Sequence, residues 1–256
     1  MHSPDELRSL VEIYLDDLAL TPELHGQAES VRYALTVGGK RVRPVLCLAT
    51  AEAAGSDPEQ TLPAAASIEL IHNFSLVHDD LPALDDDAVR RGNPSVWAQY
   101  GEAIAVLAGD ALLGEAFRLA LSYPTPAVGR ELAQATLGMI GGQYLDITGT
   151  SPDEATLHEL KTGCLFAASI AMALWVADVP EAEQTPWRAF GDELGPLFQI
   201  VDDILDGDGY VLSHGEDGAR ALADKAAERA QARLDGIDAD TSVLAEIVSG
   251  LATRTA

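Results

Sequence analysis

Residues 71–91 read IHNFSLVHDDLPALDDDAVRR. An apolar segment leads into Asp79 and Asp80, a four-residue spacer follows, and three more aspartates stand at positions 85–87 before Arg90 and Arg91. The apolar residues of the approach recur at helical spacing, so the stretch predicts a helix that carries acids at its end. Five carboxylates therefore lie within nine positions.

The aspartates of this stretch must repel one another. At an effective dielectric of about 20, two like charges about 4 Å apart repel by about 4 kcal/mol. Protonation, dispersal into water or a bound cation would relieve the repulsion, and carboxylates with substrate phosphates are usual ligands of Mg²⁺. Arg90 and Arg91 agree with this interpretation, because a guanidinium binds phosphate through paired hydrogen bonds. Taken alone, an acidic run is more often a solvated loop with a basic flank.

A second acidic cluster lies far downstream, at residues 198–206, FQIVDDILD. Asp202 and Asp206 are one helical turn apart, and Asp203 is three residues before Asp206, so the three carboxylates gather along one face of a helix. They interrupt a strongly apolar segment, where uncompensated charge is costly. We expect the two acidic segments to face each other across a cavity and to share Mg²⁺ ions.

A compact basic motif, GGKRVRP, occupies residues 38–44. The two glycines end the preceding helix, and Lys40 and Arg43 would share one face of the helix that restarts. Free backbone amides at a helix start add to such an anion site. A basic cluster of this kind is more often a solvated face, but the whole chain has only three lysines.

Three further polar residues are candidates for the same site. His72 lies seven residues before Asp79, two helical turns away on the same face, which suits contact with a second ligand. A lone histidine on a helix is, however, often a packing residue. Lys161 and Thr162 open the most apolar predicted helix, after the motif GGQYLD at residues 141–146. Lys161 must face either solvent or a cavity there.

Composition limits the classes of protein to consider. The chain has 256 residues, 47% hydrophobic, with 16 basic against 41 acidic residues and a net charge of −25. Such an acidic balance argues against nucleic-acid and anionic-membrane partners. Cys47 and Cys164 stand in apolar stretches without metal-ligand spacing, which predicts buried reduced thiols and a cytoplasmic protein.

The N-terminus has no signal-peptide layout. The longest uncharged stretch, 162–177, is shorter than the roughly 18 or more residues of a spanning helix, so we expect a buried core helix and no membrane span.

The pattern along the chain predicts an all-α protein. Ala, Leu, Glu and Arg recur at spacings of three and four residues, and few segments alternate as strands do. Pro and Gly clusters divide the chain into about ten helices, and no linker marks a boundary, so we expect a single domain over residues 1–256. The segments Ser3-Pro4-Asp5-Glu6 and Ser151-Pro152-Asp153-Glu154 each predict a helix start with a serine cap.

The order of these motifs resembles one family. GGKRVRP, DDLPALD followed by RRG, GGQYLD, KTG and FQIVDDILD stand in that order, and over residues 30–207 the chain resembles the trans-prenyltransferases that make short-chain isoprenyl diphosphates. The resemblance implies the all-α isoprenoid synthase fold, a bundle around a central cavity, usually assembled as a homodimer.

The resemblance also implies roles for individual residues. Two aspartate-rich motifs would hold three Mg²⁺ ions on the diphosphate of an allylic substrate, dimethylallyl or geranyl diphosphate. The first motif is Asp79, Asp80 and Asp85, and the second is Asp202, Asp203 and Asp206, with Asp79, Asp85, Asp202 and Asp206 as metal ligands. Arg90 would contact the same diphosphate. Isopentenyl diphosphate would be bound by Lys40, Arg43, His72 and Arg91. Lys161, Thr162 and Gln199 would lie near the leaving group and the cation.

The implied reaction is the head-to-tail condensation of isopentenyl diphosphate with the allylic diphosphate. We expect farnesyl diphosphate as the product, because Phe74 and Ser75, five and four residues before Asp79, would form a floor under the growing chain, and the spacer LPAL resembles the bacterial farnesyl type. The alternatives are a geranyl or geranylgeranyl diphosphate synthase, or a weakly active partner subunit of a catalytic homologue.

One feature departs from the family pattern. Family members usually carry a loop rich in glycine and lysine after the second motif, whereas here Gly207-Asp208-Gly209-Tyr210 follows Asp206 and the only later lysine is Lys225. Either the loop is absent or a disordered stretch is missing from the sequence at this point. The missing lysine puts closure over the allylic diphosphate in doubt, but it removes no predicted metal ligand.

Overall fold

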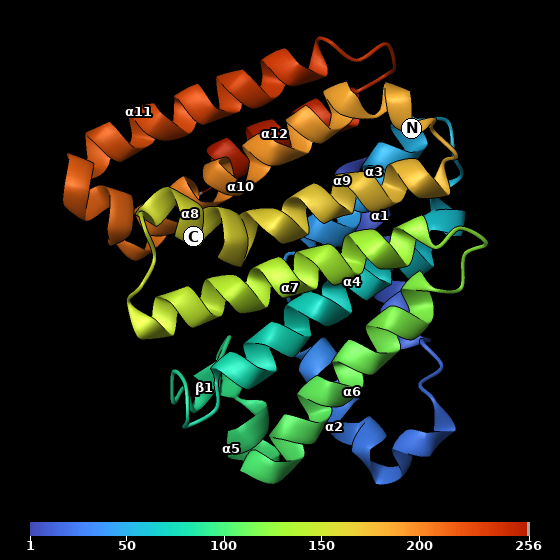
Figure 1. The fold of residues 1–256 in the computed structure, drawn as a ribbon, viewed down its shortest axis with the longest axis vertical. Coiled ribbons are helices and arrows are strands. Elements are labelled where there is room, and N and C mark those ends of the chain that lie inside the picture. Colours follow the sequence, from blue (N-terminus) through green and yellow to red (C-terminus); the bar gives the residue numbers. More distant parts are fainter. Residues whose placement is uncertain (255–256) are drawn as a thin grey trace.

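The computed structural model describes residues 1–254, which form a bundle of helices (Figure 1). The α-helices are α1 (Pro4–Asp16), α2 (Ala28–Thr36), α3 (Val42–Ala53), α4 (Pro58–Asp79), α5 (Val96–Tyr100), α6 (Glu102–Ala120), α7 (Ala127–Thr148), α8 (Glu154–His158), α9 (Cys164–Val176), α10 (Thr185–Asp206), α11 (Gly209–Leu234) and α12 (Ser242–Ala252). Between them lie the 3₁₀ turns η1 (Pro22–Gln27) and η3 (Glu181–Glu183) and the π-helical turn η2 (Glu159–Gly163).

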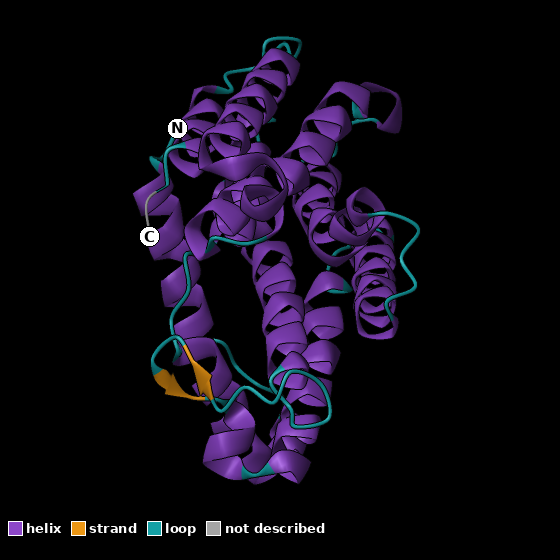
Figure 2. Cartoon of the chain, turned by 90° about the vertical axis from the view of Figure 1, so that its left-hand side faces the viewer, coloured by secondary structure: helices purple, strands orange, loops and turns teal. Residues whose placement is uncertain are grey.

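The only strands among the described residues are β1 (Val89–Arg90) and β2 (Asn93–Pro94), which pair antiparallel beside the helices (Figure 2). Helices α5 and α8 have five residues each, and the ten others of the described part have nine or more. The all-α prediction of about ten helices is confirmed. The predicted single domain 1–256 stays a prediction, and its last two residues, 255–256, lie outside the described residues.

The helix starts follow local capping chemistry. Ser3 accepts from the backbone N–H of Glu6 while the Glu6 carboxylate accepts from the Ser3 backbone, which is the predicted cap of α1. The second predicted cap is wrong, because the Ser151 hydroxyl donates to the Asp153 carbonyl and Asp153 itself caps α8 by accepting from Thr156. Position within the turn, rather than residue type, decides which side chain reaches the free amide.

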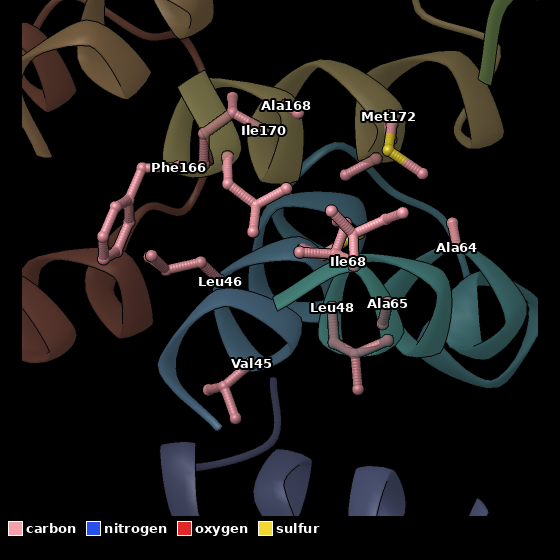
Figure 3. Packing of buried hydrophobic residues seen from close by; sticks show 14 of the residues in the cluster. Val45, Leu46, Leu48, Ala64, Ala65, Ile68, Phe166, Ala168, Ile170 and Met172 are labelled. Carbon is pink, nitrogen blue, oxygen red and sulfur yellow. The ribbon is translucent and has the colours of Figure 1, made fainter. Parts of the chain in front are cut away.

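Helix α4 is the centre of the core. It packs against α3, α6 and α9, and buried aliphatic side chains of α3, α4 and α9 interlock around it (Figure 3). Ile68 and Leu46 are fully buried there, as is Phe166 on α9. Because α4 is apolar on nearly every side, it can only be an internal helix. The acids at its C-terminal end are therefore held by a rigid element.

Helix α9 forms a second internal layer beside α3 and α10. The run Glu154–Val176, of which α9 is the larger part, is long and apolar enough to cross a membrane by length and composition, and half of its most apolar window is buried in the bundle. Cys47 on α3 is buried as predicted, whereas Cys164 is only partly buried; neither thiol forms a disulfide.

Candidate active site

One large cavity is lined by residues of α3, α4, α7 and α10 and of the loops beside them. Its volume is about 1600 Å³. Fourteen of the residues predicted for the site line it: Lys40, Arg43, His72, Phe74, Ser75, Asp79, Arg90, Arg91, Lys161, Thr162, Gln199, Asp202, Asp203 and Asp206. Asp80 and Asp85 do not line it. The structure therefore brings the two acidic segments, more than a hundred residues apart, to the same hollow.

The first acidic motif lies where α4 ends. Asp79 is the last residue of α4, and burial together with the nearby carboxylate of Asp85 raises its pKa to about 6, against the opposing charge of Lys161. Asp80 is buried and is ion-paired with Arg90. The backbone N–H of Asp85 donates to the Asp79 carbonyl at 2.9 Å, so the loop folds back on the helix end. The Asp85 side chain is exposed.

The second acidic motif closes α10. Asp202 and Asp206 line the cavity, and burial raises the pKa of Asp202, as do the neighbouring carboxylates. Asp203 differs from these two residues, because both of its oxygens are used inside the protein. It accepts from the Gln199 side chain at 2.7 Å and from the Tyr210 backbone at 2.9 Å. Asp203 therefore anchors the end of α10 to the start of α11.

A polar chain crosses from the π-helical turn to α10. The Thr162 hydroxyl donates to the Gln199 side-chain carbonyl at 3.2 Å, and the amide of Gln199 donates to Asp203. All three are predicted site residues: Asp203 and Thr162 from the sequence pattern as well as the resemblance, and Gln199 from the resemblance alone. Their hydrogen bonds give this wall of the cavity a fixed geometry.

Lys161 reaches the cavity because the chain bulges. It lies in η2, a single π-helical turn between α8 and α9, and such turns occur frequently at functional sites. Two glycines make the bulge possible. A side chain at Gly142 of α7 would come within 2.5 Å of the Lys161 backbone nitrogen, and one at Gly195 of α10 within 2.6 Å of Gly163. The Lys161 ammonium forms an ion pair with Asp146.

The basic wall is built by α3 and the loop before it. Arg43 is enclosed, with its guanidinium over the rings of Phe166 and Phe198 at 4.5 and 5.4 Å. Burial lowers the pKa of Arg43 to about 10. His72 faces the same space, and burial together with the nearby arginines lowers its pKa well below the usual range, so it is neutral at pH 7.

The prediction that Lys40 and Arg43 share a helical face is wrong. Helix α3 begins at Val42, and its cap residue Arg41 has a left-handed backbone with φ of 51°, so Lys40 stands in the loop before the helix. Both residues still line the cavity, from a loop and from a helix.

Arg254 is a cavity residue that sequence reasoning missed. Its guanidinium lies 3.5 Å from Asp202 and 5.6 Å from the centre of the Phe198 ring. No motif surrounds it, and only the packing of α12 against α10 brings it here. Nothing in the local sequence could have identified it.

The predicted floor residues lie at the deep side of the cavity. Phe74 is buried, and its ring meets the His78 ring edge to face at 4.9 Å. His78 is held by the Val106 carbonyl at 3.0 Å and fits against Gly109, where a side chain would come within 2.1 Å of it. The Ser75 hydroxyl donates to the His72 carbonyl. Phe74 is therefore supported from behind by α6.

Among residues 1–254, no three His, Cys, Asp or Glu side chains gather closely enough to hold a metal ion on their own. The arrangement nevertheless fits Mg²⁺, which is usually bound by one or two carboxylates together with waters and substrate phosphates. The raised pKa values of Asp79 and Asp202 show acids whose charge is poorly compensated, as a cation would correct.

The connection after α10 is as short as the sequence suggested. Only Gly207 and Asp208 separate Asp206 from the start of α11, and α11 itself bends at Gly215, whose φ is 73°. The lysine loop expected from the resemblance has no counterpart in this connection.

The sequence profile described as "Polyprenyl synthetase" matches residues 26–219. The chain belongs to the polyprenyl synthetase family. The matched range includes both aspartate-rich motifs, the basic motif and the π-helical turn. Family membership therefore rests on the same segments that form the cavity.

Relatives in the family agree with this assignment. The chain is 40% identical to a geranylgeranyl diphosphate synthase of Cyanophora paradoxa over 193 residues, 70% of this chain and 64% of that protein. It is 34% identical to the farnesyl diphosphate synthase of Bacillus subtilis over an alignment of 268 residues, 97% of this chain and 90% of that protein. The match to a Capsicum annuum geranylgeranyl pyrophosphate synthase spans 56% of that relative, so the chain covers under two thirds of some relatives.

A solved structure supports the fold. The geranyltransferase of Legionella pneumophila superposes with a TM-score of 0.86 and 30% identity, covering 98% of this chain and 96% of the other. The isoprenoid synthase fold predicted from the motifs is confirmed.

Proposed function

We propose that this chain catalyses the Mg²⁺-dependent head-to-tail condensation of isopentenyl diphosphate with an allylic diphosphate. The observation that carries the proposal is the meeting of two acidic helix ends, at Asp79 and Asp206, with the basic wall of Arg43 and Lys40 in one cavity. A site with two such regions can hold two anionic substrates in different ways. The names of the relatives, farnesyl and geranylgeranyl diphosphate synthases, support the same activity.

The chain's own residues would divide the work. Lys161, beside Thr162 on the π-helical turn, and Arg90 would hold the diphosphate of the allylic substrate. Arg43, with Lys40, His72 and Arg91, would hold isopentenyl diphosphate. The aromatic and aliphatic deep side, including Phe74, would take the prenyl chain. Both reacting carbons would thus be fixed between two bound diphosphates.

Bound Mg²⁺ would neutralise the allylic diphosphate and the pyrophosphate that leaves from it. The metal ions would be held by Asp79, Asp85, Asp202 and Asp206. In the reaction the bond between C1 and the diphosphate oxygen breaks, and the electron pair leaves with pyrophosphate. The double bond of isopentenyl diphosphate forms the new carbon–carbon bond to C1, and a proton passes from the isopentenyl unit to pyrophosphate. Lys161 and Arg90 would stabilise the charge that develops on the leaving group.

Farnesyl diphosphate is the proposed product, with dimethylallyl and geranyl diphosphate as primers. The buried ring of Phe74, supported by His78, favours a short chain. Geranylgeranyl diphosphate is the alternative that the relatives' names keep open, since both products occur among them.

A homodimer is part of the proposal. Apolar side chains on neighbouring faces of α6 and α7 are exposed in the single chain: Ile104, Val106 and Leu107 on α6, and Leu137, Ile140, Tyr144 and Ile147 on α7. Three of the α7 residues, Ile140, Tyr144 and Ile147, also line the cavity, so a second copy of this chain on that face would close the cavity from one side. A cytoplasmic location stays a prediction from composition.

The test is turnover by the purified chain alone. With Mg²⁺, isopentenyl diphosphate and each allylic primer, we expect pyrophosphate release and farnesyl diphosphate. Activity appearing only after a catalytic homologue is added would favour the partner-subunit alternative instead. Asp217→Asn is the control for substitutions of the site aspartates, because Asp217 of α11 is exposed and lies outside the cavity. It should leave turnover unchanged.

A further inference from the structure

Arg41 lies at the centre of a charge network in the basic wall, where both Arg41 and Glu69 are among the residues that line the cavity. Its side chain is 2% exposed. Nη1 donates to Glu69 of α4 at 2.6 Å, Nε donates to Glu12 of α1 at 3.0 Å, and Nη2 donates to the Leu35 carbonyl at 2.6 Å. These contacts join α1, the end of α2 and α4 at one point.

Glu69 is the buried acid that forms an ion pair with Arg41. Its side chain is 3% exposed, and besides Arg41 it accepts from the Asn73 amide at 3.2 Å. Glu69 stands one turn before His72 on α4, so the two side chains share one face of the helix, and both residues line the cavity. A carboxylate enclosed in this way must be neutralised by a cation or by a proton.

Among residues 1–254, the two neighbouring arginines, Arg43 and Arg91, form no ion pair. Arg43 forms no ion pair, and its Nε is buried without a hydrogen-bond partner among the described residues. Arg91 donates to the Gly38 carbonyl. The charge of Glu69 nevertheless acts on both, because it raises the pKa of Arg43 and of Arg91 against the lowering effect of burial. Glu69, Arg43 and Arg91 also line the same cavity, so without Arg41 the Glu69 carboxylate can attract either guanidinium.

The loop before α3 is shaped by the same network. A side chain at Gly39 would come within 2.9 Å of the Arg91 Nη1 atom and 3.2 Å of the Arg41 Nη1 atom, so both guanidiniums pack against this turn. Arg41 has a left-handed backbone, and although it lines the cavity with Lys40 and Arg43, its guanidinium is taken up by Glu69, Glu12 and the Leu35 carbonyl. The three basic residues of the motif therefore serve two different purposes.

We infer that Arg41 is a positioning residue for the isopentenyl diphosphate site: by neutralising Glu69 it leaves Arg43 and Arg91 free to bind the diphosphate. The inference rests on the proposed function and assigns a role within it. Removal of Arg41 alone would leave a buried carboxylate beside two arginines, and these would turn toward it. Removal of both charges would restore the balance, because replacing a buried ion pair by apolar residues is often neutral, whereas breaking one is costly.

The test is a double-mutant cycle of Arg41 and Glu69, in which KM is measured separately for isopentenyl diphosphate and for the allylic substrate. In Arg41→Met we expect KM for isopentenyl diphosphate to rise about tenfold, while kcat and KM for the allylic substrate stay within about threefold. In Arg41→Met/Glu69→Met we expect KM for isopentenyl diphosphate to return to within about threefold of the natural value. Arg41→Lys, which keeps the charge opposite Glu69, should fall between them.

Arg32 provides the matched control. It is an arginine of α2 that donates to the Asp16 and Leu18 carbonyls outside the cavity. Arg32→Met should lower the Tm without a selective change in KM. Glu69→Gln leaves Arg41 paired with Glu12, and it should leave KM for isopentenyl diphosphate equal or lower, because it removes the competing charge.

Three results would overturn the inference: KM for both substrates rising together in Arg41→Met, a double variant as impaired as the single one, or a raised KM in Glu69→Gln. A lower Tm with unchanged KM for isopentenyl diphosphate in Arg41→Met would show that Arg41 has only a structural role. This result would also contradict the inference. Absence of turnover in the unsubstituted chain would instead count against the proposed function. Calorimetric binding of isopentenyl diphosphate to the same variants then tests the inference without turnover.

Discussion

The Gln199 side chain connects Thr162 to Asp203: it accepts from the threonine hydroxyl at 3.2 Å and donates to the carboxylate at 2.7 Å. Asp203 is 5% exposed. Because an amide can both accept and donate, Gln199 is suited to join a hydroxyl and a carboxylate across two helices. The end of α10 depends on this connection.

Gln199→Leu should therefore lower both stability and turnover. A buried carboxylate that loses a donor costs about 1–3 kcal/mol. We expect a lower Tm and a fall in kcat, because Asp202 and Asp206 flank the disturbed carboxylate. Thermal unfolding and steady-state kinetics measure the two effects. Gln231→Leu, at a partly exposed position of α11, is the control and should change neither. Wild-type kcat in Gln199→Leu would disprove the role of the connection.

The two adjacent glycines of α7 make a matched pair. A methyl group at Gly142 would meet the backbone nitrogen of Lys161 at 2.5 Å, whereas one at Gly141 would meet nothing within 4 Å. Gly142→Ala should displace the π-helical turn and reduce kcat at least about tenfold. The backbone of Lys161 cannot move aside as the end of a flexible side chain could. Gly141→Ala should keep activity and stabilise the helix by up to about 1 kcal/mol. Equal effects of the two substitutions would show that the close contact is unimportant.

Phe74→Ala should lengthen the product. The ring blocks the deep side of the cavity, and its removal leaves space that a longer prenyl chain can fill. Product analysis by chromatography should show a shift toward geranylgeranyl diphosphate. Phe117→Ala of α6, a partly buried aromatic outside the cavity, should retain the natural product. An unchanged chain length in Phe74→Ala would remove Phe74 from the floor.

Glu131 should stabilise the protein near neutral pH but not at acid pH. Burial alone would raise the pKa of Glu131, but hydrogen bonds from Arg188 and Trp175 outweigh burial and hold it below the ordinary value. A lowered folded-state pKa stabilises the protein above the unfolded pKa, and this stabilisation is lost as pH falls through the folded value. The Tm difference between the natural chain and Glu131→Gln should be largest near pH 7 and shrink below about pH 4. A difference that is constant with pH would contradict this assignment.

The sequence predicted the acidic helix ends well because their evidence is local. Spacing of three and four residues puts Asp202, Asp203 and Asp206 on one side of a helix, whatever the rest of the chain does. It could not predict that Asp203 turns inward, since its partners Gln199 and Tyr210 are set by how α10 meets α11.

Longer-range features escaped prediction for physical reasons. Lys40 was placed on a helix because its spacing to Arg43 is helical, but the left-handed backbone at Arg41 starts the helix later. Glu69 stands in an apolar helical run and gives no signal of its own, although tertiary contact makes it the partner of Arg41. Arg254 reaches Asp202 only through the packing of α12.

The most direct measurement is the binding of a non-cleavable allylic thiodiphosphate by calorimetry, with and without Mg²⁺, to the natural chain and to Asp79→Asn and Asp202→Asn. The account predicts binding that requires Mg²⁺ and is weakened at least about tenfold by either substitution, since acids from two helices would share the ions. Metal-independent binding, or binding that survives both substitutions unchanged, would contradict it.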